Sequence, residues 1–268
     1  MLSFSGLSVG WALSFRARYL WLSFLSLLVL VLVVLLAAQF SGRQPATVGL
    51  DVGLSVMRGA LPVVSILTAQ VLISHEFERR YFISFLSYPR PRFKFLLERF
   101  AVVAISTIFL LLVMALVLAV LIKAVTGYDQ STPVDLGRGY WVVIAFLGID
   151  LLIVSAFAAL LAVVSSTSSF VLVGTLGFVV LARSYAGVID LLNDNGSLVA
   201  DADSYSSGVG LLFYVLPNLG ALDLRPVALY STMEFLPEGW GWLIFSNLSY
   251  MVAVLAFSVW VLQRKRLV

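Results

Sequence analysis

Hydrophobic residues gather in six long blocks along the chain, separated by shorter polar segments. The blocks cover residues 19–40, 54–74, 101–122, 140–164, 170–189 and 240–262. Each block is close to the roughly 20 residues of helix that cross the hydrocarbon core of a bilayer. Membrane-spanning strands would be shorter and would alternate apolar with polar residues, whereas residues 25–38 are apolar everywhere except at Ser26. The pattern therefore predicts an all-α polytopic membrane protein with six transmembrane helices.

The composition agrees with a membrane protein and removes several classes of function. Hydrophobic residues make up 61% of the 268 positions and charged residues 12%, whereas about a quarter of the residues in soluble domains are charged. We expect one transmembrane domain over residues 1–268. Cysteine is absent, which excludes disulfides and thiolate metal sites. No basic stripe lies on a soluble face, so we expect no nucleic-acid partner.

The distribution of basic residues predicts the orientation. Of the 17 Lys and Arg residues, two precede the first block, six lie between the second and third blocks, and three follow the last. Cytoplasmic loops of membrane proteins carry an excess of Lys and Arg. The segments on the other side are richer in Asp and Glu, especially from Asp190 to Glu238. Both termini are therefore predicted to be cytoplasmic.

Two segments outside the blocks have amphipathic or interrupted apolar patterns. In residues 1–18, one helical face carries Phe4, Leu7, Trp11 and Phe15, which is typical of a helix lying in the membrane interface. Residues 190–239 form an external loop that is too long for a simple turn. Its second half is apolar but interrupted by Pro217 and Gly220. We interpret that half as a pair of short re-entrant or interfacial helices.

Residues 76–91, in the loop after the second block, form the most highly charged stretch of the chain. An apolar stripe at helical spacing consists of Phe77, Tyr81, Phe85 and Tyr88. The charged positions around it include Glu76, Glu78, Arg79 and Arg80. The spacing predicts a cytoplasmic amphipathic helix of about three turns. Pro89 and Pro91 end it, because proline lacks the N–H and disfavours helical geometry in the preceding residue.

This charged helix has two interpretations. Its basic residues could serve only to set the topology and to bind anionic membrane lipid, at about 1 kcal/mol each near the surface. The interleaved Glu76 and Glu78 would not favour anionic lipid, and the aromatic stripe exceeds what a topology signal needs. We therefore favour a helix that is gripped by a protein partner.

The chemistry expected of an enzyme is missing from the sequence. His75 is the only histidine, so "HEFER" cannot be a zinc-binding H-E-x-x-H motif. No lysine follows a glycine, which excludes the G-x-x-x-x-G-K-[ST] phosphate loop. We predict no catalytic residue, no metal site and no cofactor in this chain.

Asp150 is the clearest carboxylate inside a predicted span. A charge in hydrocarbon is costly, so a cation is expected beside it, and the available cations are Arg183 and Arg58. Three roles stay open for these residues: a buried ion pair, a part of a cargo path, or side chains that reach water.

Three short motifs resemble the permease subunits of type-2 ATP-binding-cassette (ABC) exporters. They are "FLSYPRPRFKFLLER" after the charged helix, "LPNLGALDLR" before the last block and the basic end "VLQRKRL". The second motif contains Pro217, Asn218 and Asp223, which the resemblance assigns to a re-entrant segment. The family often has Gly-Thr where this chain has Tyr81 and Phe82, so the subfamily and the cargo stay open.

The resemblance implies an architecture and a set of partners. Residues 1–18 would be an elbow helix, and residues 76–91 a coupling-helix loop that docks on a cytoplasmic ABC ATPase. The residues expected to couple to this ATPase are Glu76, Phe77, Glu78, Arg79, Arg80, Tyr81, Phe85 and Tyr88. ATP and magnesium would bind to the ATPase. The permease would pair with an identical or related second permease subunit, lie in a bacterial inner membrane among its lipids, and be able to meet a periplasmic partner.

The function expected from these features is ATP-driven export or extraction of a substrate across or from the membrane. Two alternatives come from other classes. A secondary carrier or channel would need no ATPase but would be expected to have several charged or broken helices at the midplane. A membrane anchor would use the same cytoplasmic helix to transmit ATPase motion to a periplasmic partner without moving cargo.

Overall fold

The computed structural model describes residues 19–74, 92–125, 134, 136–165, 167–194 and 216–264. The predicted elbow helix, residues 1–18, and coupling-helix loop, residues 76–91, lie outside the described residues. All eight residues predicted to couple to an ATPase belong to that loop, so their roles stay predictions. The structure bears on the other predicted sites.

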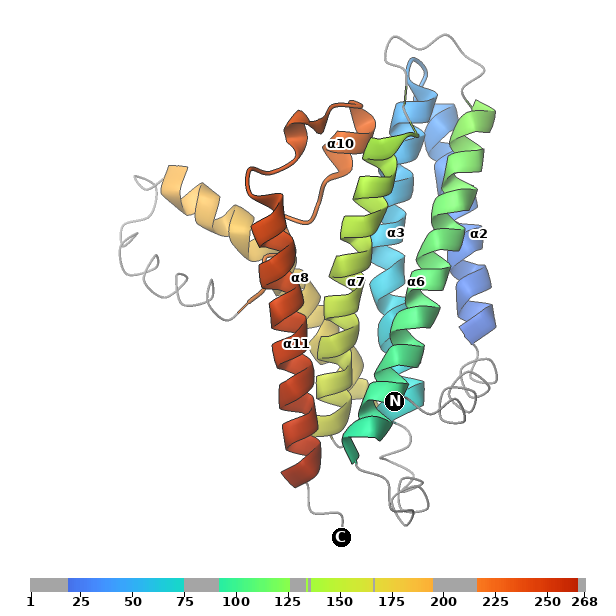
Figure 1. Cartoon of the computed structure of the whole chain (residues 1–268). Helices are drawn as coiled ribbons and strands as arrows, with labels where there is room; N and C mark the ends of the chain where they lie inside the picture. Colours follow the sequence, from blue (N-terminus) through green and yellow to red (C-terminus); the bar gives the residue numbers. More distant parts are fainter. Residues whose placement is uncertain are drawn as a thin grey trace.

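The described chain is a bundle of long helices (Figure 1). In chain order they are α2 (Tyr19–Phe40), α3 (Pro45–Ala69), the π-helical turn η1 (Gln70–Ser74), α6 (Arg92–Val125), α7 (Arg138–Val164), α8 (Ser168–Asp194), α10 (Arg225–Leu229), the 3-10 turn η2 (Met233–Phe235) and α11 (Trp240–Arg264). Within the described residues, α2, α3 with η1, α6, α7 and α11 are long and apolar enough to cross a membrane. The apolar part of α8 is the shorter stretch Ser168–Ser184. Five of the six predicted spans are therefore supported by length and hydropathy.

Several helices extend beyond the predicted apolar blocks. α3 begins at Pro45 rather than at residue 54, with proline in its first turn, where a missing N–H costs nothing. α6 begins at Arg92, directly after Pro91, rather than at residue 101. α8 continues to Asp194, so the external loop starts later than residue 190. Hydropathy locates the hydrocarbon part of a helix, whereas the helical backbone can continue beyond it.

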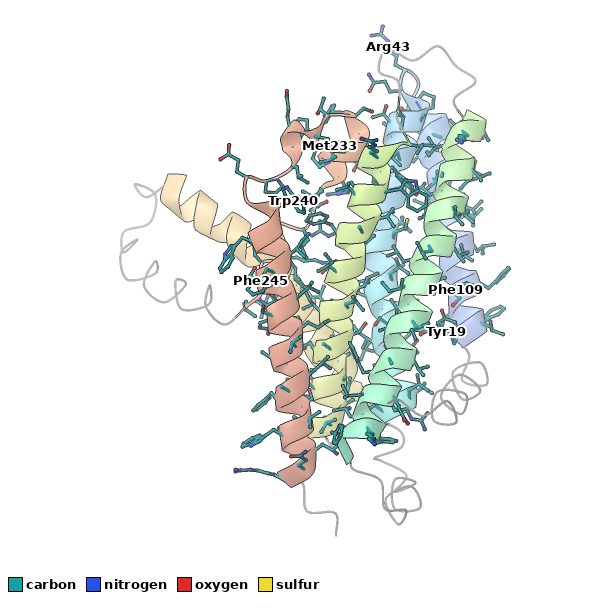
Figure 2. All side chains as sticks on the ribbon, viewed as in Figure 1. Tyr19, Arg43, Phe109, Met233, Trp240 and Phe245 are labelled. Atoms are coloured by element: carbon teal, nitrogen blue, oxygen red, sulfur yellow. The ribbon has the colours of Figure 1, made fainter. Side chains whose placement is uncertain are left out.

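α3 and α7 form the centre of the bundle. In their most apolar windows 56% and 67% of residues are buried, against 22% in α2 and 17% in α11. α11 turns large aromatic side chains outward (Figure 2), among them Trp240, Trp242 and Phe245. Lipid or another subunit can cover such a face, whereas α3 and α7 are held by their neighbours within the chain.

Hydrogen bonds and small side chains join the spans, as expected where lipid removes most of the hydrophobic drive between helices. The hydroxyls of Ser65 and Ser155 lie 2.7 Å apart between α3 and α7. Tyr140 of α7 donates a 2.6 Å bond to the carbonyl of Ala115 on α6. Gly53 of α3 lies against Leu118, so a methyl group there would require the Leu118 side chain to shift.

An aromatic stack joins α8 to its two neighbours. The ring of Phe178 lies over that of Phe157 of α7 with a centroid distance of 3.8 Å, and the ring centroid of Tyr250 on α11 lies 6.4 Å from that of Phe178.

The start of α2 and the end of α11 lie at one end of the bundle (Figure 1), and the α2–α3 hairpin, α10 and η2 lie at the other. We refer to the second end as the outer end, following the predicted orientation.

Candidate functional site

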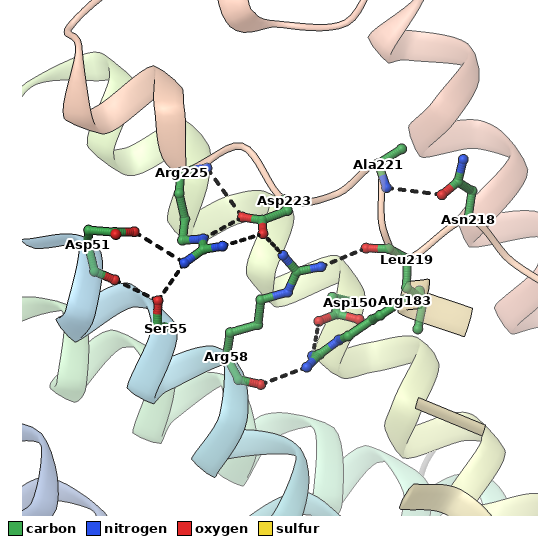
Figure 3. A network of polar contacts seen from close by, with 10 residues as sticks. All are labelled: Asp51, Ser55, Arg58, Asp150, Arg183, Asn218, Leu219, Ala221, Asp223 and Arg225. Atoms are coloured by element: carbon green, nitrogen blue, oxygen red, sulfur yellow. Dashed lines mark hydrogen bonds and ion pairs between the residues drawn. The ribbon is translucent and has the colours of Figure 1, made fainter. Parts of the chain in front are cut away.

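α3 presents a polar stripe near the outer end of an otherwise apolar bundle. Asp51, Ser55 and Arg58 are spaced at i, i+4 and i+7, which puts them on one face of the helix. The Ser55 hydroxyl donates a 2.8 Å bond to the carbonyl of Asp51. The stripe points toward residues 216–225, the segment that leads into α10 (Figure 3).

Asp223 of that segment lies between two arginines. Arg225 binds it in a two-pronged arrangement, with Nε 2.9 Å from Oδ1 and Nη2 2.9 Å from Oδ2. Arg58 forms an ion pair with the same Oδ2 atom. Nη1 of Arg225 then reaches Oδ1 of Asp51 at 3.1 Å and the hydroxyl of Ser55 at 2.5 Å. The external segment is thus bound to α3 through paired charges.

Arg58 also links this group of charges to the inside of the bundle. Its Nη2 donates a 3.0 Å bond to the carbonyl of Leu219, and its own backbone carbonyl accepts a 3.0 Å bond from Nη1 of Arg183 on α8. Nη2 of Arg183 lies 2.5 Å from Oδ2 of Asp150 on α7. Asp150 therefore has a cation beside it, and the contacts run from α7 through α8 and α3 to the external segment (Figure 3).

The Asp150–Arg183 pair is the most deeply buried part of the network. The Asp150 side chain is 2% exposed and that of Arg183 18%. Within the described residues, Oδ1 of Asp150 and Nε of Arg183 have no hydrogen-bond partner. Removing one member of a buried pair leaves the other charge uncompensated, which costs about 3–5 kcal/mol. The pair therefore holds α7 and α8 together only while both charges are present.

The turn before Asp223 is shaped for close approach to α8. The N–H of Leu219 donates a 3.2 Å bond to the carbonyl of Ala182. A methyl group at Gly220 would lie 2.9 Å from the carbonyl oxygen of Arg183, so only glycine fits without a backbone shift. Asn218 stabilises the turn by accepting a 3.0 Å bond from the N–H of Ala221. These contacts position Asp223 toward Arg58.

Asp223 and Arg225 stay charged at neutral pH. Burial by itself would raise the pKa of Asp223, but the hydrogen bonds from Arg225 and the charge of Arg58 outweigh it and lower this pKa below its ordinary value. The hydrogen bonds with Asp223 raise the pKa of Arg225, against the opposing effect of partial burial. Each group therefore stabilises the ionised form of the other.

The network gathers equal numbers of acidic and basic side chains: Asp51, Asp150 and Asp223 with Arg58, Arg183 and Arg225. Each acidic side chain is paired with a basic one from another part of the chain or from the same turn, which is an arrangement suited to holding elements together. In the part of the chain that the structure describes, no group of three or more His, Cys, Asp or Glu side chains could hold a metal ion.

Five of the residues singled out in the sequence lie in or beside this network: Arg58, Asp150, Arg183, Asn218 and Asp223. Pro217 is buried at the start of the same turn. Sequence reasoning missed the parts played by Asp51, Ser55 and Arg225. The hydropathy pattern places Asp51 in a loop, because the apolar block begins after it. Its spacing to Ser55 and Arg58 on one helical face is the signal that could have included it.

The external segment was predicted to form a pair of short helices, and only residues 216–239 of it belong to the described chain after α8. Its described part contains α10 and η2, and Val227 of α10 packs against Gly139 at the start of α7. Whether these helices enter the membrane in a re-entrant way stays a prediction.

The comparison with known families covers most of the bundle. Residues 15–183 match the family described as ABC-2 family transporter protein. No curated protein matches the chain significantly. The matched range includes α2, α3, α6, α7 and α8 as far as Arg183, and it ends before the external segment that carries Asp223. With more than half of its residues in the match, the chain belongs to the ABC-2 transporter family and is an integral membrane component of such a transporter.

Proposed function

We propose that this chain is the permease subunit of an ABC exporter, in which a separate cytoplasmic ATPase drives export or extraction of a substrate across or from the membrane. ABC-2 permeases generally act with an ATPase, and the family match supports that pairing. The structural observation that carries the proposal is the course of α3. One helix with its terminal turn runs from the outer charged network to Ser74, directly before the predicted coupling-helix loop.

α3 and α8 are connected at both ends. Near the outer end, Arg183 donates to the carbonyl of Arg58. At the other end, the side chain of Gln70 donates to the carbonyl of Ser168. With a rise of 1.5 Å per residue, the two connections lie about 18 Å apart along α3 and about 22 Å apart along α8. A displacement of the cytoplasmic end of α3 would therefore move both helices and reach the charged network.

Two features define where α3 can bend. Pro62 lies inside the helix, and residues 70–74 form a π-helical turn. Kinks occur at prolines and at π-bulges, because both interrupt the regular hydrogen-bond ladder. Both lie between the outer network and the coupling-helix loop, so bending at these points would change how much motion reaches Arg58.

In this mechanism the ATPase subunits close on ATP, and the coupling helices follow them. The two permease halves rock relative to each other, and the outer network breaks or re-forms as the external segment moves on α3 and α7. ATP and magnesium are bound by the ATPase, which lies at the cytoplasmic face of a bacterial inner membrane. The outward-facing sides of α2 and α11 leave room for the second permease subunit.

The ATPase partnership can be tested by purification from the native membrane. The tagged wild-type chain is expected to bring down a vanadate-sensitive ATPase, and a Glu78→Ala, Arg79→Ala, Arg80→Ala variant is expected to lose most of that activity. The reason is that the variant removes three of the four charges named on the predicted coupling helix while leaving its aromatic stripe. The ATPase activity of the eluate, normalised to the amount of permease, gives the result.

An Arg43→Ala variant is the matched control, because Arg43 lies on the α2–α3 hairpin at the opposite end of the bundle. It should retain the ATPase of the wild type. Wild-type eluate without any ATPase would contradict the exporter proposal and favour a carrier. An equal loss of ATPase activity in the Arg43→Ala variant would contradict the assignment of residues 76–91 as the coupling-helix loop.

A further inference from the structure

A cavity of about 420 Å³ lies between the external segment and the start of α11. Its walls include Leu216, Pro217, Pro237, Trp242, Leu243 and Tyr250. The volume falls within the roughly 300–1,000 Å³ of small-molecule sites, which are mainly apolar with a few polar groups. The cavity lies on the α11 side of the external segment, away from the ion pairs on α3.

One polar residue in this wall has an unmet hydrogen-bonding capacity. Asn247 is 2% exposed, and its amide nitrogen donates a 2.9 Å bond to the carbonyl of Leu243 one turn earlier. Its side-chain oxygen has no partner within the described residues. An unpaired buried acceptor costs about 1–3 kcal/mol. Asn247 lines the cavity, and the terminal torsion of asparagine is broad, so rotation of the amide group can turn this oxygen toward a molecule there.

The charge at the cavity disfavours an anion, and its buried unpaired acceptor favours a hydrogen-bond donor. Glu238 supplies a carboxylate, and no lysine or arginine of the described residues lines the cavity. The other polar residues of the lining are neutral: Asn218, Trp242, Ser246, Asn247 and Tyr250. The site also lies where α11 begins, beside the exposed Trp240 and Trp242. Tryptophans of this kind concentrate at the membrane–water interface. The exposed Phe245 and Val252 continue the apolar surface along α11.

We propose that this cavity binds an amphiphile whose head group donates hydrogen bonds and carries no net negative charge, with its apolar tail lying along α11. The head would donate to the side-chain oxygen of Asn247, and Glu238 at the mouth would disfavour anionic heads. Trp242 and Tyr250 would enclose the junction of head and tail. This proposal does not rest on the proposed ATPase coupling, because binding to the cavity can be measured without ATP.

The test uses the full chain in detergent and probes that share one dibrominated hydrocarbon tail, which quenches tryptophan fluorescence on contact. A monoacylglycerol supplies a hydroxyl donor, an alkylamine an ammonium donor, the methyl ester no donor and the free fatty acid an anion. We expect at least one donor probe to bind roughly tenfold more tightly than the methyl ester, as expected for one buried hydrogen bond. The donor probe that binds more tightly then identifies the preferred head group as a hydroxyl or an ammonium.

Substitution of Asn247 connects the selectivity to the residue. Asn247→Leu should bind the donor probe and the methyl ester with about equal affinity. Asn247→Asp keeps an acceptor oxygen and should therefore still bind the donor probe more tightly than the methyl ester. Ser258→Ala is the matched control, since Ser258 is also a buried polar residue of α11 but does not line the cavity. A Trp242→Phe variant identifies the part of the quenching that arises at this cavity.

Two results would overturn the proposal. The first is that the wild type binds the methyl ester as tightly as it binds both donor probes. The other is unchanged selectivity in an Asn247→Leu variant whose thermal midpoint equals that of wild type. If that variant does not fold, loss of selectivity in a folded Asn247→Asp variant overturns the proposal in its place.

Discussion

An Asp150→Asn variant is expected to be about 3–5 kcal/mol less stable than the wild type, because it leaves the Arg183 cation buried without its counter-charge. Arg183→Gln should have a similar effect, because it leaves the Asp150 carboxylate buried without its counter-charge. The Asp150→Asn, Arg183→Gln double variant should lose less than the sum of the two, with a coupling energy of about 1–3 kcal/mol. Unfolding in detergent, followed by tryptophan fluorescence, measures all three.

Asp51→Asn provides the same chemical change at the exposed end of the network. The Asp51 side chain is 47% exposed, and its partner Arg225 retains the ion pair with Asp223 when Asp51 is neutralised. A loss of under about 1 kcal/mol is expected there, as for surface ion pairs. Strict additivity of the Asp150 and Arg183 substitutions would contradict an energetically important pair, and so would equal losses at Asp150 and Asp51.

Replacing Arg58 with glutamine is expected to loosen the external segment from α3. Arg58 forms an ion pair with Asp223 and donates to the carbonyl of Leu219, and both contacts hold residues 216–225 on the bundle. Since the chain has no cysteine, a single Val227→Cys substitution gives a clean reporter. Val227 is fully buried on α10, so its thiol should react with a membrane-impermeant maleimide only when α10 lifts.

The labelling rate of Val227→Cys is expected to rise about tenfold or more when Arg58→Gln is added, because each 1.4 kcal/mol lost from the closed state gives a tenfold larger open fraction. Arg43→Gln is the control, since it removes a guanidinium from the α2–α3 hairpin at the same end of the bundle. An unchanged rate in Arg58→Gln would mean that the apolar contacts of α10 hold the segment without the ion pair.

The long helices could be predicted from the sequence because the bilayer sets a minimum apolar length. Their ends could not, since polar residues such as Asp51 lie in helix outside the hydrocarbon block. The partner of Asp51 is Arg225, which is far away in the sequence. No local pattern carries that information.

The candidate site was partly predictable for a similar reason. The burial cost of Asp150 demanded a cation, and Arg183 was one of two candidates inside the spans. The link from Arg58 to Asp223 depends on how residues 216–225 fold over α3, with Gly220 close to the backbone of α8. That packing is a property of the assembled bundle. The elbow helix, the coupling helix and the placement of the re-entrant segment stay predictions.

The most direct test of transmission through α3 is the labelling rate of Val227→Cys in the complex with its ATPase, compared with and without ATP and vanadate. If ATPase closure reaches the outer network, trapping should change the labelling rate at least severalfold, and the Glu78→Ala, Arg79→Ala, Arg80→Ala variant should abolish the change. An identical rate in the trapped and nucleotide-free complexes, with the ATPase bound and active, would contradict the proposal that α3 carries the motion to the external segment.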